Sequence, residues 1–288
     1  MSLNVEVSPF TDQARGVAER AAAAARVQVV DEFEMDRLND IADLLIAVWG
    51  TAQQDAPIPA ELLRSISHAG CNVTAAYDAR GVLCGAAAAI VSPETDSVYS
   101  LIAGVRAGLA DAGVGFALKQ HQRAWALARG LGTMMWTFDP LVSRNARFNL
   151  TKLGATSSEY VRDFYGPMAD GINADDDSDR LVAVWSLTSD RTVASSEGLG
   201  GRVELPDFSM TDVRALGPDE HPVLIAAGDS LWCRVPADIV ALRGQDRMQA
   251  TAWRACIRDI LTEAFAAGRT ARGVTRAGWY RLANGVES

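Results

Sequence analysis

The chain has few cysteines, and their positions point to neither a metal site nor a disulfide framework. Four cysteines lie far apart in 288 residues, without a C-x-x-C pair and without histidines at metal-ligand spacing. Cysteine is a residue type that proteins commonly bury. We therefore expect reduced, buried thiols and no metal.

Long apolar runs and a targeting segment are also missing. No apolar run reaches the roughly eighteen residues that a membrane span needs. The N-terminus lacks a charged start followed by an apolar core and a cleavage site. We therefore expect a cytoplasmic protein without a membrane partner.

Positive charge is in the minority, because the chain has 27 Lys and Arg residues and 36 Asp and Glu residues, which gives a formal net charge of −9. No basic stripe is available to neutralise phosphates, which argues against a nucleic acid partner. Acidic residues gather at 31–36 and at 175–179, and we expect the second run to form a solvated turn. A composition of 49% hydrophobic and 22% charged residues is typical of a soluble, globular, enzyme-sized protein.

Helices and strands succeed one another over the first two thirds of the chain. An alanine-rich helix at 11–26 has little apolar bulk, which suggests a surface lid or arm. Gly50 is expected to end a helix, and Asp78–Gly81 to form the turn of a hairpin. The expected elements are a strand at 27–33, helices at 34–50 and 59–70, strands within 72–92 and at 97–105, a helix from about 114, a strand at 133–140, a helix at 142–154 and a strand at 180–187.

The last third is less regular. The polar, glycine-rich segment 188–201 is the expected linker. Beyond it the sequence predicts a strand near 230–236, a helix from about Met248 to Ala267 and a last strand within 273–282. This tail is short for an independent enzyme, and a degenerate half-copy of the preceding domain is one interpretation of it.

A glycine-bearing turn precedes the long helix that begins near Val114. Such a turn presents backbone N–H groups and the positive end of the helix dipole to an anion. Gly113 and Gly115 suit this use, although an ordinary helix start remains the alternative. A dinucleotide fingerprint fails because the third glycine is missing, and a Walker loop fails because Phe116 and Ala117 follow where Lys and Ser or Thr are required.

The middle of the chain resembles a known family. The blocks "GFALKQHQRAWALARGLGTMMWTFDPLVSRNARFNLTKLGA" and "DFYGPMADGINADDDSDRLVAVW", with "RVPADIVALR" and "RAGWYRL" in the tail, resemble an actinobacterial branch of the Gcn5-related N-acetyltransferase (GNAT) superfamily. In that family Arg or Gln, two residues, Gly, one residue, and Gly or Ala wrap the pyrophosphate of acetyl-CoA. The corresponding residues here are Ala110–Gly115.

The resemblance implies an α/β fold with a mixed, twisted sheet, splayed at its fourth and fifth strands, with helices on both faces and a C-terminal α/β extension. The implied domains are an N-terminal helical arm at 1–26, a GNAT-like domain at 27–190 and the extension at 200–288. The implied co-substrate is acetyl-CoA or another acyl-CoA. The residues expected to bind it are Val105, Asp111, Ala112, Gly113, Val114, Gly115 and Asn145.

The sequence departs from the family at the donor loop. We expect Gln or Arg in place of Ala110 and Gly in place of Asp111. A carboxylate about 4 Å from a pyrophosphate would repel it by a few kcal/mol at an effective dielectric of about 20. The turn is therefore expected to bind an acyl-CoA weakly, in altered geometry, or to bind something less charged.

The catalytic positions also depart from the family. Tyr99, Ser100 and Leu101 stand where His-Ser-His is expected, so Tyr99 and Ser100 are the remaining polar candidates for proton transfer. Leu150 occupies the place of the usual tyrosine acid. Its neighbour Asn149 donates hydrogen bonds but supplies no acidic proton.

Three further residues are candidates for contact with the acceptor substrate. Asp139 ends a strand near the expected cleft, with a turn-making or capping role as the alternative. Trp136 on that strand and Tyr165 in an aromatic loop are the others, with simple packing as their alternative. His121 has no recognisable partner carboxylate, and we expect it to be a core or interface residue.

The sequence thus predicts an N-acyltransferase that moves an acyl group from acyl-CoA, or from a pantetheine thioester on a carrier protein, to an amine of a small molecule. The alternative is a GNAT-fold protein that has lost CoA-dependent acetylation and binds a small molecule or catalyses a different reaction. A purely structural, partner-binding protein is the third interpretation, and a homodimer stays open.

Overall fold

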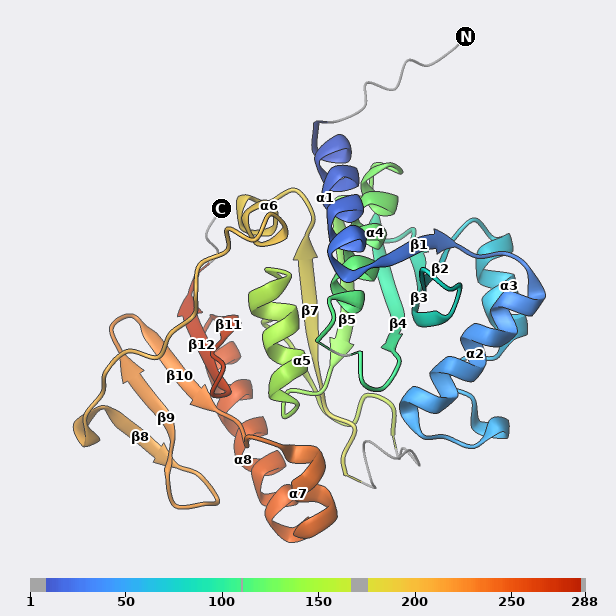
Figure 1. Ribbon diagram of the computed structural model, residues 1–288. Helices are drawn as coiled ribbons and strands as arrows, with labels where there is room; N and C mark the ends of the chain where they lie inside the picture. Colours follow the sequence, from blue (N-terminus) through green and yellow to red (C-terminus); the bar gives the residue numbers. More distant parts are fainter. Residues whose placement is uncertain (1–8, 110, 167–175, 286–288) are drawn as a thin grey trace. The chain divides into compact units, whose positions relative to one another are not determined.

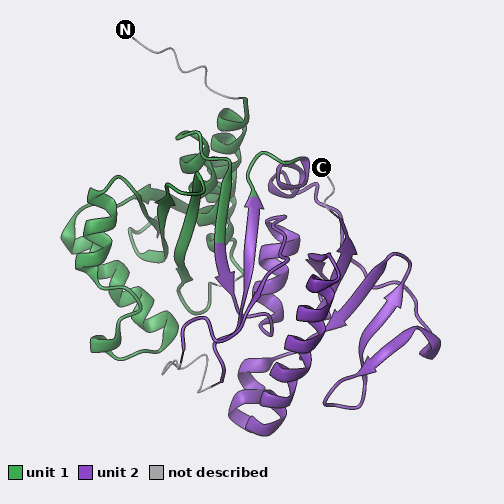
Figure 2. Ribbon diagram, turned by 180° about the vertical axis from the view of Figure 1, so that it is seen from behind, with its two compact units in different colours: residues 1–135, 186–189 green, residues 136–185, 190–288 purple. Residues whose placement is uncertain are grey.

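The computed structural model describes residues 9–109, 111–166 and 176–285. The chain forms two compact units (Figure 2). Unit 1 holds the residues up to Met135 together with Ser186–Ser189, and unit 2 holds Trp136–Trp185 and the residues from Asp190. Strand β5 (Thr133–Phe138) begins in unit 1 and ends in unit 2.

Unit 1 contains a mixed sheet (Figure 1). Its antiparallel strands are β1 (Val27–Asp31), β2 (Asn72–Asp78), β3 (Leu83–Ser92) and β4 (Ser97–Val105), hydrogen-bonded in chain order. The start of β5 then pairs in parallel with β4, over Thr133–Met135 and Ser97–Tyr99. This one parallel step after an antiparallel meander matches the mixed sheet that the sequence predicts.

The helices of unit 1 begin and end close to the positions expected from the sequence. They are α1 (Pro9–Ala25), α2 (Met35–Trp49), the 3-10 turn η1 (Gln53–Asp55), α3 (Ala60–His68) and α4 (Val114–Leu127). Gly50 follows α2 with φ 65°, and its N–H donates to the Ile46 carbonyl. Glycine adopts this left-handed conformation with little strain, so the predicted end of α2 is confirmed.

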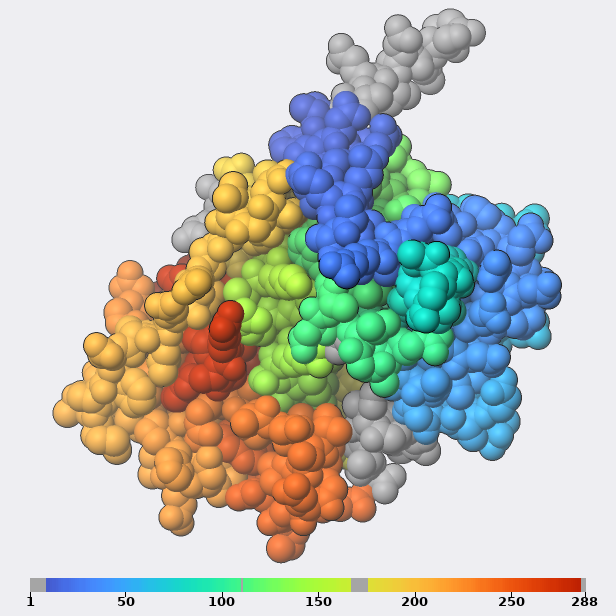
Figure 3. Space-filling model, in the orientation of Figure 1, coloured from blue at the N-terminus to red at the C-terminus, as the bar shows by residue number. Residues whose placement is uncertain are grey.

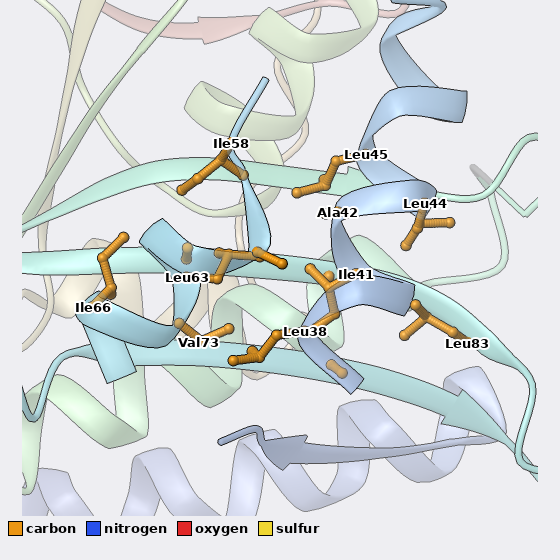
Figure 4. Close-up of a cluster of buried hydrophobic side chains, with 14 residues drawn as sticks. Leu38, Ile41, Ala42, Leu44, Leu45, Ile58, Leu63, Ile66, Val73 and Leu83 are labelled. Atoms are coloured by element: carbon orange, nitrogen blue, oxygen red, sulfur yellow. The ribbon is translucent and has the colours of Figure 1, made fainter. Parts of the chain in front are cut away.

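Helices cover both faces of this sheet. Alternate residues of a strand point to opposite faces, and here Ala75 and Ala86 pack on the side of α2 and α3 while Ala76 and Ala87 pack on the side of α4. Figure 4 shows the first of these clusters, in which leucines and isoleucines of α2 and α3 meet the sheet. The fold class predicted from the sequence, a mixed sheet with helices on both faces, is confirmed.

The alanine-rich helix α1 packs alongside α4 (Figure 1). Its buried positions are small, with Ala14 and Ala21 among them, and they allow close approach of the two helices. The Thr11 hydroxyl donates to the Leu127 carbonyl at 3.4 Å. The helix forms part of the surface of unit 1 (Figure 3), as expected, and it is also an integral layer of that unit.

Unit 2 contains a second sheet and the remaining helices. In the first sheet's strand order, β5 is followed by β7 (Arg180–Ser186) and β6 (Tyr160–Val161). The second sheet is antiparallel, in the order β11 (Arg269–Val274), β12 (Trp279–Asn284), β10 (Ser230–Arg234), β9 (Pro222–Ala227) and β8 (Val213–Leu216). The helical segments are α5 (Ser143–Arg147), the π-helical turn η2 (Phe148–Lys152), α6 (Asp190–Ser196), the 3-10 turn η3 (Met210–Asp212), α7 (Ile239–Gln245) and α8 (Arg247–Ala266).

Several predictions for the last third are wrong. The expected linker 188–201 contains helix α6. The expected last strand is a pair, β11 and β12, joined by a turn in which Gly278 adopts φ 80°. Strands β8 and β9 were not expected from the sequence. The second sheet has no parallel step like that of β4 and β5, and the three-domain division and the half-copy interpretation stay predictions.

No helix among the described residues has both the length and the apolar character needed to cross a membrane.

Candidate functional site

The segment between β4 and α4 is the turn for which the sequence predicts anion binding. Val105, the last residue of β4, pairs with Gly85 of β3. The chain then makes two successive turns, in which the Leu109 N–H donates to the Arg106 carbonyl and the Ala112 N–H donates to the Leu109 carbonyl. Leu109 and Val105 pack against the apolar cluster beneath α4, which holds the turn in place.

Gly113 connects this turn to α4. It adopts φ 85° at the N-cap position, a conformation that strains other residue types. Its carbonyl accepts the Ala117 N–H at 3.0 Å, so the helical ladder begins here. A Cβ at this position would lie 3.5 Å from Ala25 Cβ, which is ordinary contact. Conformation, and not space, therefore requires the glycine.

The start of α4 presents the backbone donors that an anion would use. The first N–H groups of a helix have no partner within it and lie at the positive end of the dipole. Here the first such groups belong to Val114 and Gly115, and the Val114 side chain is buried. Asp111 and Ala112 are exposed beside them, and Ala110 lies outside the described residues. The acidic neighbour expected from the sequence is thus present in the turn.

A β-bulge lies in the middle of β4. The register with β3 passes from Ala88–Ile102 to Ala89–Ser100, so Leu101 is the extra residue. A bulge takes the extra residue out of the ladder and redirects the neighbouring side chains. Tyr99 is the last residue of β4 that pairs with β5. The catalytic candidate Ser100 follows it and directly precedes the extra residue of the bulge.

Ser100 is buried and hydrogen-bonded to α4. Its hydroxyl accepts from Lys119 Nζ at 2.7 Å and donates to Gln122 Oε1 at 3.1 Å. Burial lowers the pKa of Lys119 to about 7, because an ammonium group loses its hydration there. Lys119 was not identified from the sequence. The only sign of it in the sequence is its place between the apolar Leu118 and the polar residues 120–123 of the same helix.

The contacts of Ser100 extend into a chain of polar side chains across the sheet. Gln122 Nε2 donates to Asn72 Oδ1 at 3.3 Å, and Asn72 Nδ2 donates to Asp31 Oδ1 at 2.9 Å. His121 Nε2 lies 3.0 Å from the same Asp31 oxygen. The inference that His121 lacks a partner carboxylate is therefore wrong. Burial opposes ionisation of Asp31, but the hydrogen bond and charge of His121 leave its pKa below the usual value.

In unit 2, Trp136 and Tyr165 lie among other aromatic and basic groups. Trp136 is buried edge-on against Trp185, with ring centroids 6.0 Å apart. Tyr165 is 50% exposed, its hydroxyl lies 3.2 Å from Thr137 Oγ1, and the Arg180 guanidinium lies over its ring at 5.1 Å. Tyr165 is thus the more accessible of the two for a ligand.

Asp139 is buried in a cluster of ion pairs. Arg254 binds both of its oxygens, at 2.8 and 2.9 Å, and Arg243 Nη2 donates to Oδ2 at 2.7 Å. Burial opposes ionisation, yet the charges and hydrogen bonds of Arg254 and Arg243 lower the pKa of Asp139 to about 2. The Leu141 N–H also donates to Oδ1. Asp139 therefore makes a turn and does not cap α5, whose N-cap residue is Val142, and contact with a substrate stays a prediction.

The acidic run at 175–179 is not a solvated turn, so that prediction is wrong. Asp175 lies outside the described residues, but Asp176 is nearly buried and pairs with Arg243 and Arg254. Asp179 is fully buried and accepts from Arg258 and from the Tyr160 hydroxyl. The arginine partners of these two carboxylates lie on α7 and α8, more than sixty residues along the chain, so the local sequence does not indicate them.

The other predicted residues of unit 2 lie on the helical segment after β5. Asn145 is exposed on α5, and Asn149 is buried in the π-helical turn η2 beside the fully buried Leu150. Unit 1 therefore holds Tyr99, Ser100, Val105 and the turn at 111–115, and unit 2 holds Trp136, Asp139, Asn145, Asn149 and Tyr165. No cluster of three or more His, Cys, Asp or Glu side chains in the described ranges could hold a metal ion.

Comparisons with known proteins give matches among solved structures. No family model matches the chain, and no curated protein matches it. A GNAT-family acetyltransferase from Desulfovibrio desulfuricans is 13% identical with a TM-score of 0.47, and the match covers 56% of this chain and 99% of that one. An aminoglycoside 6'-acetyltransferase of type Ii is 15% identical with a TM-score of 0.44, over 56% and 98% of the two chains. An acetyltransferase from Salmonella typhimurium, solved with its cofactor acetyl-CoA, is 15% identical with a TM-score of 0.45, over 57% and 95%. These three solved structures are described as acetyltransferases.

Proposed function

We propose that the chain is a GNAT-type N-acyltransferase that moves an acyl group from acyl-CoA, or from another pantetheine thioester, to an amine of a small molecule. The observation that carries this proposal is the turn at 111–115, where Gly113 in a left-handed conformation opens a fourteen-residue helix at the end of β4. Backbone donors at such a helix start suit the pyrophosphate of a CoA carrier. The resemblance of the sequence to the GNAT superfamily, including its actinobacterial branch, points to the same donor.

The bulge in β4 supports the chemistry. Because Leu101 is taken out of the ladder, its backbone N–H is the group that would polarise a thioester carbonyl lying along β4. In the reaction the neutral amine bonds to the carbonyl carbon, the carbon–sulfur bond breaks, and the amine's surplus proton passes to a base while the thiolate takes one. Tyr99 is the proposed acid for the thiolate. Ser100, whose neutral hydroxyl is too weak a base to keep a proton, would relay the amine's proton to the neutral form of Lys119, its hydrogen-bond partner at 2.7 Å.

The acceptor end of the proposal rests on unit 2. The exposed Tyr165 offers aromatic surface to the acceptor, and the buried Trp136 stays a predicted acceptor contact. Asn145 is a proposed contact of the acyl-CoA, and Asn149 a proposed hydrogen-bond donor in catalysis. A free coenzyme and a carrier protein would present the same pantetheine thioester. We further propose a cytoplasmic protein, with a homodimer open.

A second candidate function is favoured by two observations. Asp111 is exposed in the very turn that would hold the pyrophosphate, and Leu150, in place of the usual tyrosine, is fully buried. A protein that has lost CoA-dependent acetylation and binds a different, less charged molecule would keep such a turn.

Calorimetric titration separates the two candidates. Acetyl-CoA, CoA and pantetheine are titrated separately into the protein, and the first two are expected to bind more tightly because they carry phosphates. Asp111→Gly should tighten acetyl-CoA binding by about tenfold, since about 1.4 kcal/mol of repulsion is removed. Gly201→Ala, a change at an exposed glycine with open space around it, is the control and should leave binding unchanged.

Two results would count against the transferase. Absence of binding of all three compounds at millimolar concentration would remove the proposal and leave the second candidate. Binding without release of free thiol, when a panel of small primary amines is added, would keep the donor site and remove the acyl transfer.

A further inference from the structure

A cavity of about 460 Å³ lies in unit 1 beside the start of the donor turn, since two of its lining residues, Arg106 and Ala107, directly follow Val105. One wall is helix α2, with Asp40 and Asp43, followed by Leu44, Ala47 and Val48. The other wall is formed by Leu83, at the start of β3, and by Arg106 and Ala107. The volume is within the range of sites for small molecules.

The charged side chains that line the cavity do not pair with one another among the described residues. Asp40 and Asp43 are one turn apart on α2, whereas Arg106 belongs to the opposite wall. Within the described chain, Arg106 makes no ion pair with either carboxylate, although both charge signs line the same cavity. The cavity is therefore lined by two carboxylates, on Asp40 and Asp43, and by one guanidinium, on Arg106.

The guanidinium of Arg106 is fixed in place. Its Nε and Nη2 both donate to the Leu83 carbonyl, at 2.9 and 2.7 Å. Five N–H donors belong to a guanidinium, so the remaining three are available to a carboxylate. This anchoring lowers the entropy that the side chain would lose when it binds an anion.

The carboxylates are more loosely held. Asp40 lies 3.7 Å from Arg37, and Asp43 accepts one hydrogen bond from Gln53 Nε2 at 3.1 Å. Each carboxylate has about four acceptor positions, so both keep capacity for an ammonium group. The apolar floor between the charged walls includes Leu44 and Leu83, which lie at one end of the buried cluster in Figure 4.

We infer that this cavity is a binding site for a small aliphatic zwitterion of the amino-acid class. The ammonium group lies against Asp40 and Asp43, the carboxylate against the free N–H groups of Arg106, and the aliphatic part on Leu44, Val48 and Leu83. An anion alone would be repelled by two carboxylates, and a cation alone would leave the guanidinium without a partner.

This site adjoins the donor turn but lies apart from Ser100, the proposed proton-transfer residue. Arg106 follows Ser100 by six residues, and a strand rises by about 3.3 Å per residue, which separates the two by about 20 Å. The inference therefore holds whether or not the chain is an acyltransferase, and its test uses no acyl donor as substrate.

The test is calorimetric titration of the full chain with L-leucine and with 6-aminohexanoate, which differ in the separation of their charges. At least one should bind, with a dissociation constant near or below about 1 mM, as expected for exposed charged groups. Its analogues without the amino group or without the carboxylate should bind at least about tenfold more weakly, because each loses one charge contact.

Substitutions assign the two charges to the two walls. Asp43→Asn should weaken binding of the zwitterion and leave the amine-free acid unaffected or improved. Arg106→Gln should weaken the zwitterion and leave the carboxylate-free amine unaffected or improved. Asp36→Asn, on the same helix but outside the cavity, and Arg15→Gln on α1 are charge-matched controls that should change nothing.

Three results would overturn the inference. Neither zwitterion binding at about 10 mM would exclude a ligand of this class. Equal losses in the control variants would place the ligand elsewhere. Displacement of the bound zwitterion by CoA in direct competition would show that the cavity belongs to the donor site instead. Thermal unfolding of each variant verifies that the protein is folded.

Discussion

The buried amine of Lys119 should give the protein a distinctive dependence of stability on pH. Burial lowers the pKa of Lys119 from 10.5 to about 7, whereas in the unfolded chain the amine keeps its ordinary value. Between these two values the unfolded state binds one proton more than the folded state. The free energy of unfolding therefore rises with pH in this window, and below pH 7 the lysine contributes a nearly constant penalty.

The size of the effect follows from the two pKa values. Each pH unit within the window changes the free energy of unfolding by about 1.36 kcal/mol. Half of the amines are already neutral at pH 7 in the folded state, so the rise between pH 7 and pH 9 is about 2 kcal/mol. The raised pKa of the buried Cys233 has the opposite effect on stability, mainly above pH 9, and measurements should stop there.

The assay is urea unfolding at several pH values from 7 to 9, for the natural chain and for Lys119→Met. The methionine variant lacks the titrating amine, so the difference between the two proteins should change by about 2 kcal/mol in favour of the natural chain as pH rises. Lys152→Met removes the chain's one other lysine and is the matched control. Parallel pH dependences of the natural chain and Lys119→Met would refute the reasoning.

Further predictions concern the ion-pair cluster and the turn. Asp139→Asn leaves two buried arginines short of negative charge and should destabilise the protein by about 3 kcal/mol or more, whereas Asp177→Asn, at a half-exposed position, should change stability by less than about 1 kcal/mol in urea unfolding. Because the folded pKa of Asp139 is about 2, its ion pairs contribute stability above the unfolded value of 3.8 and lose it as pH falls toward 2. Acid unfolding should therefore shift to higher pH in Asp139→Asn, and an unchanged transition would contradict this. Gly113→Ala should lower stability by about 1 kcal/mol because of the positive φ, and more than Gly115→Ala within the helix; equal losses in thermal unfolding would argue against the strained turn.

Local sequence patterns predicted the layers of unit 1 well. Helix α2 ends at Gly50 and the hairpin turns at Asp78–Gly81, as expected, because such signals act over a few residues. Helix α6 lies in polar sequence and strand β8 has only four residues, while β9 is a short apolar run, PVLIAA, without the alternation typical of a half-buried strand. Their formation depends on packing against distant segments.

The polar sites show the same limit more clearly. The turn at Gly113 could be found from the sequence because its residues are adjacent. Lys119 and Ser100 are nineteen residues apart, His121 and Asp31 ninety, and Asp139 and Arg254 one hundred and fifteen. Such pairs form through the arrangement of whole strands and helices, which a single sequence does not display. The acidic run at 176–179 was consequently taken for a solvated turn.

The account depends on the backbone donors at the start of α4 binding the carrier of an acyl group. The most direct measurement is a titration of nitrogen-15-labelled protein with acetyl-CoA, followed through its backbone amide signals. The amides of Val114 and Gly115 should shift most and saturate together, because their N–H groups would donate to the pyrophosphate. Unchanged signals at these two residues, with acetyl-CoA at millimolar concentration, would contradict the account.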